Sequence, residues 1–137
     1  MASAVCNSFK TEVLGGTHDL DTDVIKLALY TSSASLSAST TAYSSTNEVV
    51  GTGYTAAGNT LAGAAITLDG STAIVDFTDT AWTTATITAR YALIYNSSKS
   101  NKAIAVLDFT TDQTATNGTF TVVFPTANSS SAIIRLS

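Results

Sequence analysis

The chain contains one histidine, His18, and one thiol, Cys6. A Ser–His–Asp triad needs a histidine as general base, so a triad here would have to be built around His18. That residue lies in a Gly-Gly-Thr-His-Asp connection, and no G-x-S-x-G sequence presents a nucleophilic serine. A zinc site needs four nitrogen or sulfur ligands, or three and a water, which one His and one Cys cannot supply. The sequence therefore predicts neither a catalytic nor a metal site at these residues.

Three carboxylates alternate at Asp19, Asp21 and Asp23, as at the start of an EF-hand calcium loop. In that loop the sixth position is glycine and the twelfth is a bidentate glutamate. Here these positions hold Val24 and Tyr30, which excludes the EF-hand. Two interpretations remain: a looser calcium site completed by other loops, and an acidic turn that caps the following strand. The second is favoured.

Glycines and a tryptophan in the middle of the chain also invite a functional interpretation. Gly51, Gly53 and Gly58 lie in the sequence GTGYTAAG, whose spacing differs from the G-x-G-x-x-G of dinucleotide-binding folds. We interpret them as positions for a bulge or a tight bend. Trp82 allows two interpretations, a core residue between sheets or an anchor in a protein interface.

Ordinary charged surface is scarce in this chain. Thr (25), Ala (21) and Ser (17) fill 63 of the 137 positions, and only 12% of the residues are charged, against roughly 25% in an average domain. The net charge of −4 argues against nucleic-acid binding, which needs concentrated positive charge. The start has no signal-peptide pattern, and no apolar run approaches the ~20 residues of a membrane span. We expect a protein that is not an enzyme and uses no cofactor.

The hydrophobic pattern predicts one short helix followed by strands. Apolar residues recur about every four positions from Ala4 to Leu14 and precede Gly15-Gly16, which is typical of a helix closed by glycine. β-branched and apolar runs between polar turns predict strands at 24–30, 47–54, 65–68, 73–77, 86–95, 103–109, 119–124 and 132–136. The predicted fold is all-β: a single-domain antiparallel β-sandwich of about eight strands over residues 1–137, with an N-terminal helical arm (1–16) and a Ser/Thr-rich loop (32–46).

Several strings together resemble a family of small virion structural proteins of tailed bacteriophages. They are GTHDLDTDVIKLALYT at 16–31, NEVVGTGYT at 47–55, Trp82, TITARYALIY at 86–95 and LDF at 107–109. In that family a DLDTD-I-K-AL-T opening, an NEV-GTGYT middle and a TITAR-A-IY segment occur in the same order. The resemblance covers about residues 9–124, and its motifs are structural rather than catalytic. It implies a β-rich particle component without enzymatic activity.

Within that family, the expected role is capsid decoration. A decoration, or cement, protein binds the outer surface of the shell formed by the major capsid protein and stabilises it. Small neutral side chains in place of charges suit a permanent assembly, since obligate interfaces exclude lone charges. We expect a homo-oligomer, a trimer, on the virion surface, made in the cytoplasm of the host bacterium and binding neither nucleic acid nor membrane.

The predicted contact surfaces are the N-terminal segment and the Ser/Thr-rich loop. The interface residues expected are Val5, Phe9, Leu14, Leu36, Tyr43 and Trp82. The main alternative is a tail- or fibre-associated virion protein that binds a receptor or glycan. A pilus or adhesin subunit is disfavoured, because the sequence shows no export signal.

Overall fold

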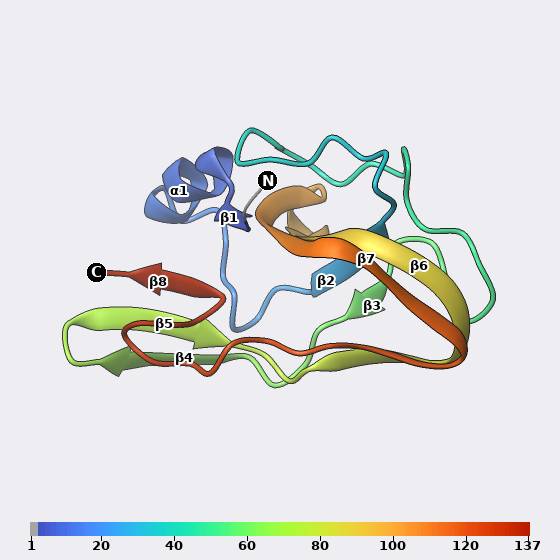
Figure 1. The fold of residues 1–137 in the computed structure, drawn as a ribbon. Coiled ribbons are helices and arrows are strands. Elements are labelled where there is room, and N and C mark those ends of the chain that lie inside the picture. Colours follow the sequence, from blue (N-terminus) through green and yellow to red (C-terminus); the bar gives the residue numbers. More distant parts are fainter. Residues whose placement is uncertain (1–2) are drawn as a thin grey trace.

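The computed structural model describes residues 3–137, which form eight strands and one α-helix (Figure 1). The elements are β1 (Ala4–Val5), α1 (Asn7–Leu14), β2 (Ile25–Tyr30), β3 (Asn59–Thr60), β4 (Ala65–Asp69), β5 (Thr72–Asp76), β6 (Thr80–Asn96), the 3₁₀ turn η1 (Ser97–Lys99), β7 (Lys102–Val122) and β8 (Ile134–Leu136). One antiparallel sheet has the order β1-β7-β6-β2-β3 and the other, the small sheet, the order β4-β5-β8. The predicted all-β fold of about eight strands with a short N-terminal helix is confirmed.

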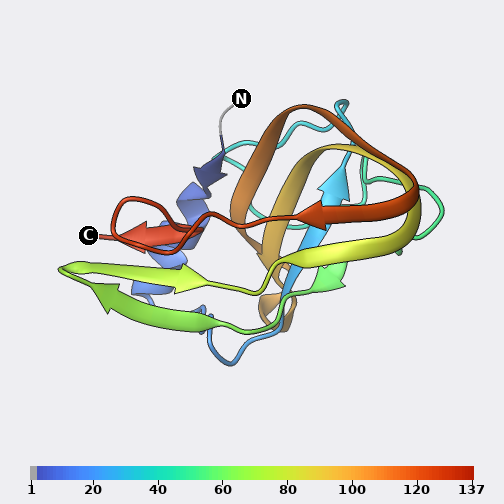
Figure 2. The ribbon, with the colours of Figure 1, turned by 60° about the horizontal axis from the view of Figure 1, so that its bottom comes forward.

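A long, bent hairpin of β6 and β7 curves around the molecule (Figure 2). Its pairing shifts at four places, the largest between Ala89–Gln113 and Tyr91–Asp108. Bulges of this kind bend a strand without ending it. Within the two strands, the non-glycine residues with left-handed backbone angles are Thr84 (φ 49°), Thr110 (φ 68°) and Asn117 (φ 47°). The predicted strands 103–109 and 119–124 are therefore parts of one strand, β7, since the residues between them bulge instead of forming a loop.

β2 lies inside the larger sheet, between β6 and β3. Gly58 packs against its backbone so closely that a Cβ atom there would lie 1.8 Å from the carbonyl oxygen of Leu27. The φ angle of Gly58, +79°, is also one that other residues rarely adopt. Both facts explain this glycine as a close-approach position beside β2.

Two predicted elements differ from the structure. Residues 47–54 form no regular strand in the described chain, because they pair only through the isolated bridges Tyr30–Glu48 and Thr52–Thr86. The first residues of the predicted helix, Ala4–Val5, instead form β1 on the edge of β7. The helix begins at Asn7, and the glycine with the positive φ angle (+79°) after it is Gly16.

The Ser/Thr-rich loop at 32–46 lies along one end of the larger sheet. Backbone hydrogen bonds join Tyr43 N to Asn101 O, and Ala103 N to Thr41 O. A third joins the first residue of α1, Asn7, to the carbonyl of Ala38. The loop is thus held by the β6–β7 turn and by the start of the helix, as an irregular cover over the sheet.

Candidate functional site

An apolar groove of about 580 Å³ separates α1 from the small sheet. In Figure 1, α1 lies above β8 and β5. The helix side of the groove includes Phe9, Val13 and Leu14. The sheet side includes Ile66 and Leu136. Most of the side chains that meet here are aliphatic, so the groove suits an apolar group of a partner.

Strand register explains why one face of the small sheet is entirely apolar. Residues directly opposite in an antiparallel pair point to the same face. The register pairs Ile66 with Val75 and Leu68 with Ala73 between β4 and β5. Between β5 and β8 it pairs Val75 with Ile134 and Ala73 with Leu136. We call these six residues, Ile66, Leu68, Ala73, Val75, Ile134 and Leu136, the apolar face.

The apolar face is covered at Val75, on the central strand, and open along β4 and at the end of β8. Val75 belongs to the core and is 4% exposed. Ile66 is 53% exposed, Leu68 69% and Leu136 59%. Leu14, at the end of α1, is 80% exposed. Exposed aliphatic side chains that gather at one place, unlike scattered ones, indicate a site of interaction.

Two cations and a carboxylate lie at the rim of the groove. Lys10 of α1, Asp19 of the acidic turn and Arg135 of β8 all contribute to its lining. Arg135 donates from Nη1 to the carbonyl oxygen of Ser129, at 3.0 Å, which fixes its side chain beside the sheet. The groove is thus an apolar surface with a polar rim, the usual anatomy of a protein interface.

The structure brings three of the six predicted interface residues to this groove. Val5, Phe9 and Leu14 all line it, although Phe9 is itself buried in the core. Leu36 and Tyr43 are elsewhere, on the loop at 32–46, where they pack partly buried against the core.

Trp82 is a core residue and not an interface anchor, so that prediction is wrong. It is 4% exposed, and its ring lies between Tyr54, at 5.7 Å, and Phe120, at 6.2 Å between centroids. The reason is its place on β6 opposite Phe120, where the register turns both side chains inward.

His18 is a structural residue that joins α1 to the end of β6. Asn96 donates from Nδ2 to His18 Nδ1 at 3.0 Å, and His18 Nε2 lies 3.0 Å from Glu12 Oε1. The orientation of the Asn96 amide follows from its Oδ1, which accepts from the backbone N–H of Ser98. His18 therefore carries its proton on Nε2 and donates to Glu12. Both ring nitrogens are engaged, so neither is free to activate a nucleophile.

The acidic turn caps β2, as the favoured interpretation predicted. Asp19 Oδ1 accepts from the backbone N–H groups of Asp21 and Thr22. Asp23 Oδ2 accepts from Asn96 Nδ2 at 2.8 Å, and this hydrogen bond lowers the pKa of Asp23 below its usual value. Within residues 3–137, no three His, Cys, Asp or Glu side chains come together as metal ligands would.

A buried carboxylate, Glu48, holds the loop segments to the larger sheet, and the sequence did not single it out. It is 7% exposed. Tyr43 donates to its Oε1 at 2.6 Å, while Tyr54 and the backbone N–H of Ala57 donate to its Oε2. Burial and these bonds to Glu48 raise the pKa of Tyr43 and of Tyr54. In the sequence, the hint of this buried cluster is the presence of tyrosines on both sides of an isolated glutamate.

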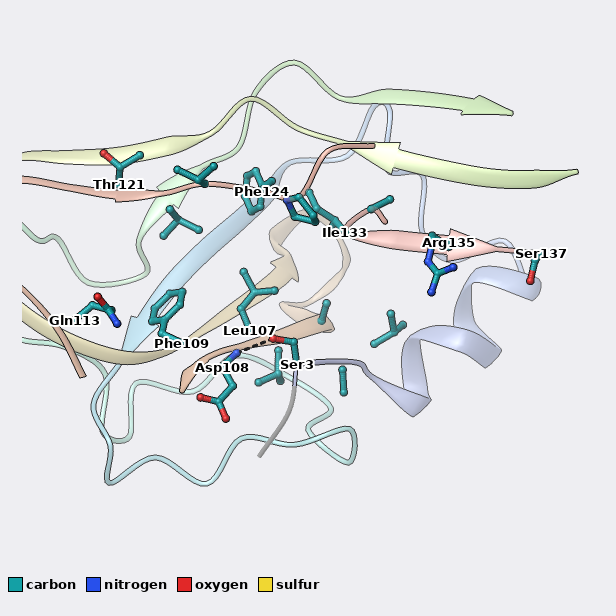
Figure 3. Close-up of a pocket in the computed structure, with 18 residues that line it drawn as sticks. Ser3, Leu107, Asp108, Phe109, Gln113, Thr121, Phe124, Ile133, Arg135 and Ser137 are labelled. Carbon is teal, nitrogen blue, oxygen red and sulfur yellow. Dashed lines mark hydrogen bonds between the residues drawn. The ribbon is translucent and has the colours of Figure 1, made fainter. Parts of the chain in front are cut away.

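A second groove, of about 720 Å³, lies on the other side of β1 and is more polar (Figure 3). Phe109, Asp108 and Gln113 line it on β7, and Arg135 lines it on β8. Burial alone would raise the pKa of Asp108, but the Thr110 N–H and the Arg90 guanidinium bring it down to about 2. Asp108 is therefore ionised at neutral pH.

Comparisons with known proteins found no relative of this chain. Protein-family models, curated proteins and solved structures gave no match to this chain. The phage virion family is therefore a prediction from the motifs quoted above. Among the residues that the structure describes, no helix has the length and apolar character that a membrane span requires.

Proposed function

We propose that this chain is a capsid decoration protein of a tailed bacteriophage. In this proposal it is made in the cytoplasm of the host bacterium and binds the outer surface of the major capsid protein shell. The motif resemblance and the scarcity of charge support this role. The observation that supports it most directly is the open part of the groove, which Leu14, Ile66 and Leu136 line while more than half exposed.

In this role the groove receives an aliphatic segment of the major capsid protein. Burying one leucine-sized side chain is favourable by about 1.5–3 kcal/mol, so a few such contacts hold each copy in place. The rim residues Lys10 and Arg135 orient the contact by pairing with polar groups of the shell. Because the protein binds only assembled subunits, its binding free energy adds to the stability of the shell by mass action.

Reconstitution of particles that lack the protein tests this proposal. Wild-type protein is mixed with such particles and sedimented with them, beside Leu14→Lys and a matched control, Val50→Lys. Both positions are highly exposed, at 80% and 95%, but Val50 does not line the groove. We expect wild type and V50K to bind in hundreds of copies per shell. L14K should bind at least about tenfold more weakly, since 1.4 kcal/mol corresponds to a factor of ten.

The same sedimentation experiment can reject the proposal. If wild type does not bind the shell, decoration is wrong. If L14K binds as well as V50K, the groove is not the contact. A few copies per particle, all on the tail, would replace decoration with the tail-associated alternative.

The side chains that line the second groove favour the tail-associated, glycan-binding alternative. Glycan-binding sites combine an aromatic ring with amide and acid groups, and the Phe109 ring and the Gln113 amide both line this groove. A glycan array probed with wild type, Phe109→Ala and Gln113→Ala tests this role. Binding of a sugar by wild type that both variants lose would support it, whereas an array without bound sugars would reject it.

A further inference from the structure

The outer edge of the small sheet, strand β4, is exposed along its whole length. All five of its residues are exposed, and β5 is its only neighbour in the sheet order. Edge strands expose unpaired backbone N–H and C=O groups, and proteins protect them with lysines, prolines, bulges or short length. The sequence of β4, AITLD, holds neither Lys nor Pro, and its pairing with β5 is regular.

The hairpin turn shows which backbone groups are free. Asp69 and Thr72 flank a two-residue turn in which Gly70 has φ +64°, as in a type II′ turn. The residues that flank such a turn exchange backbone hydrogen bonds, and alternate pairs along the ladder do the same. Thr67 therefore bonds toward β5, whereas the N–H and C=O groups of Ile66 and Leu68 point outward. These two residues also carry the exposed side chains of the apolar face.

The other sheet edges are shorter or charged. β1 and β3 have two residues each. β8 has three, and its central residue, Arg135, is hydrogen-bonded to Ser129 and lines the groove beneath α1. Among the described residues, β4 is thus the longest of the four strands that stand last in a sheet order. The part of β7 beyond its pairing with β1, residues 107–122, is interrupted by bulges, which protect an edge.

We infer that β4 pairs with β4 of a second copy of this chain, antiparallel and across a two-fold axis through Thr67. Thr67 is the middle residue of β4, so this register pairs all five residues of both strands. It places Ile66 opposite the partner's Leu68 on the same face, with their free backbone groups in hydrogen-bonding position. The two small sheets then form one sheet of six strands with a continuous apolar face.

The charge pattern of β4 favours a second copy as the occupant. The register places Asp69, the only charged residue of β4, opposite the partner's Ala65, so no like charges meet. The carboxylate of Asp69 also accepts the backbone N–H of Ser129.

The arrangement differs from the trimer expected from the sequence. A closed ring of three copies uses two different surfaces on each copy, whereas a self-complementary surface closes at two. β4 is self-complementary in the register above. The pairing does not depend on capsid binding, since its hydrogen bonds use the backbone edge of β4.

Molar mass in solution and a designed cross-link test the pairing. By light scattering, wild type should have twice the 14.0 kDa mass of one chain. Leu68→Lys should be a folded monomer, because its ammonium would face the partner's apolar side chain. Ala65→Lys, with the same charge on the opposite face of the same strand, should remain a dimer, because it would lie opposite the partner's Asp69.

The cross-link reports the register. Thr67→Cys should form a disulfide-linked dimer under mild oxidation, since the two Cα atoms of such a pair lie about 4.5 Å apart. Ala65→Cys should not, because its copies lie about 13 Å apart along the strands. The native thiol, Cys6, is buried in both variants. A monomeric or trimeric wild type, a dimeric L68K or an unlinked T67C would each overturn the pairing.

Discussion

Strands β2 and β4 are both mainly apolar, yet the molecule uses them in opposite ways. β2 has a neighbour on each edge, and five of its six residues are buried. β4 has one neighbour, and all five of its residues are exposed. An apolar strand paired on both edges and covered on both faces stabilises the fold. One with a free edge and an open face is available to a partner, which is why the proposed contacts lie on the small sheet.

The largest expected effect separates these two strands directly. Leu29→Ala in β2 removes a fully buried side chain and should lower the free energy of unfolding by about 2–5 kcal/mol. Leu68→Ala in β4 should change it by less than about 0.5 kcal/mol in dilute protein, because that side chain is already exposed. Urea unfolding followed by circular dichroism measures both. Equal losses for the two variants would contradict the distinction between core and contact strands.

A somewhat smaller effect is expected where the loop segments meet the larger sheet. Glu48→Ala leaves Tyr43 and Tyr54 without their buried acceptor and should cost about 3 kcal/mol, the upper range for a hydrogen bond to a charged group. The same change should expose the loop at 32–46 to proteases. Limited proteolysis with mass spectrometry detects this. Unchanged cleavage in E48A would show that Glu48 does not hold the loop.

The smallest effect concerns acid pH. Asp23 and Asp108 have lowered pKa values in the folded chain, that of Asp108 about 2 against an ordinary 3.8. A lowered folded pKa means stability that is complete above about pH 4 and is lost as the pH falls toward 2. Urea midpoints at several pH values should show this fall. Asp108→Asn should flatten it, and an identical fall in D108N would remove Asp108 as a cause.

Local patterns were sufficient for the elements that depend on local sequence. The strands predicted at 65–68 and 73–77 are β4 and β5, and the turn that joins them has a glycine with positive φ, Gly70. The strand predicted at 24–30 is β2, one residue shorter. The continuity of β7 could not be predicted in this way. It depends on bulges in β7 that the neighbouring strand β6 accommodates. The residues at 110–118 are polar, so from their composition they resemble a loop.

The candidate site was predicted in part. Val5, Phe9 and Leu14 were grouped because they lie close in sequence, and all three line the groove. Ile66 and Leu136 were missed, since period-two alternation shows which residues share a face and not whether anything covers it. The burial of Trp82 could not be predicted from local sequence either, because it depends on Phe120, 38 residues away in the chain.

The most direct test of the proposed role is the temperature at which particles release their genome. Particles that lack the protein are measured alone, with wild type added, and with Leu14→Lys added. The proposal predicts that wild type raises the release temperature and that L14K leaves it at the level of the undecorated particle. Release at one common temperature, despite wild-type protein bound to the shell, would contradict a stabilising role.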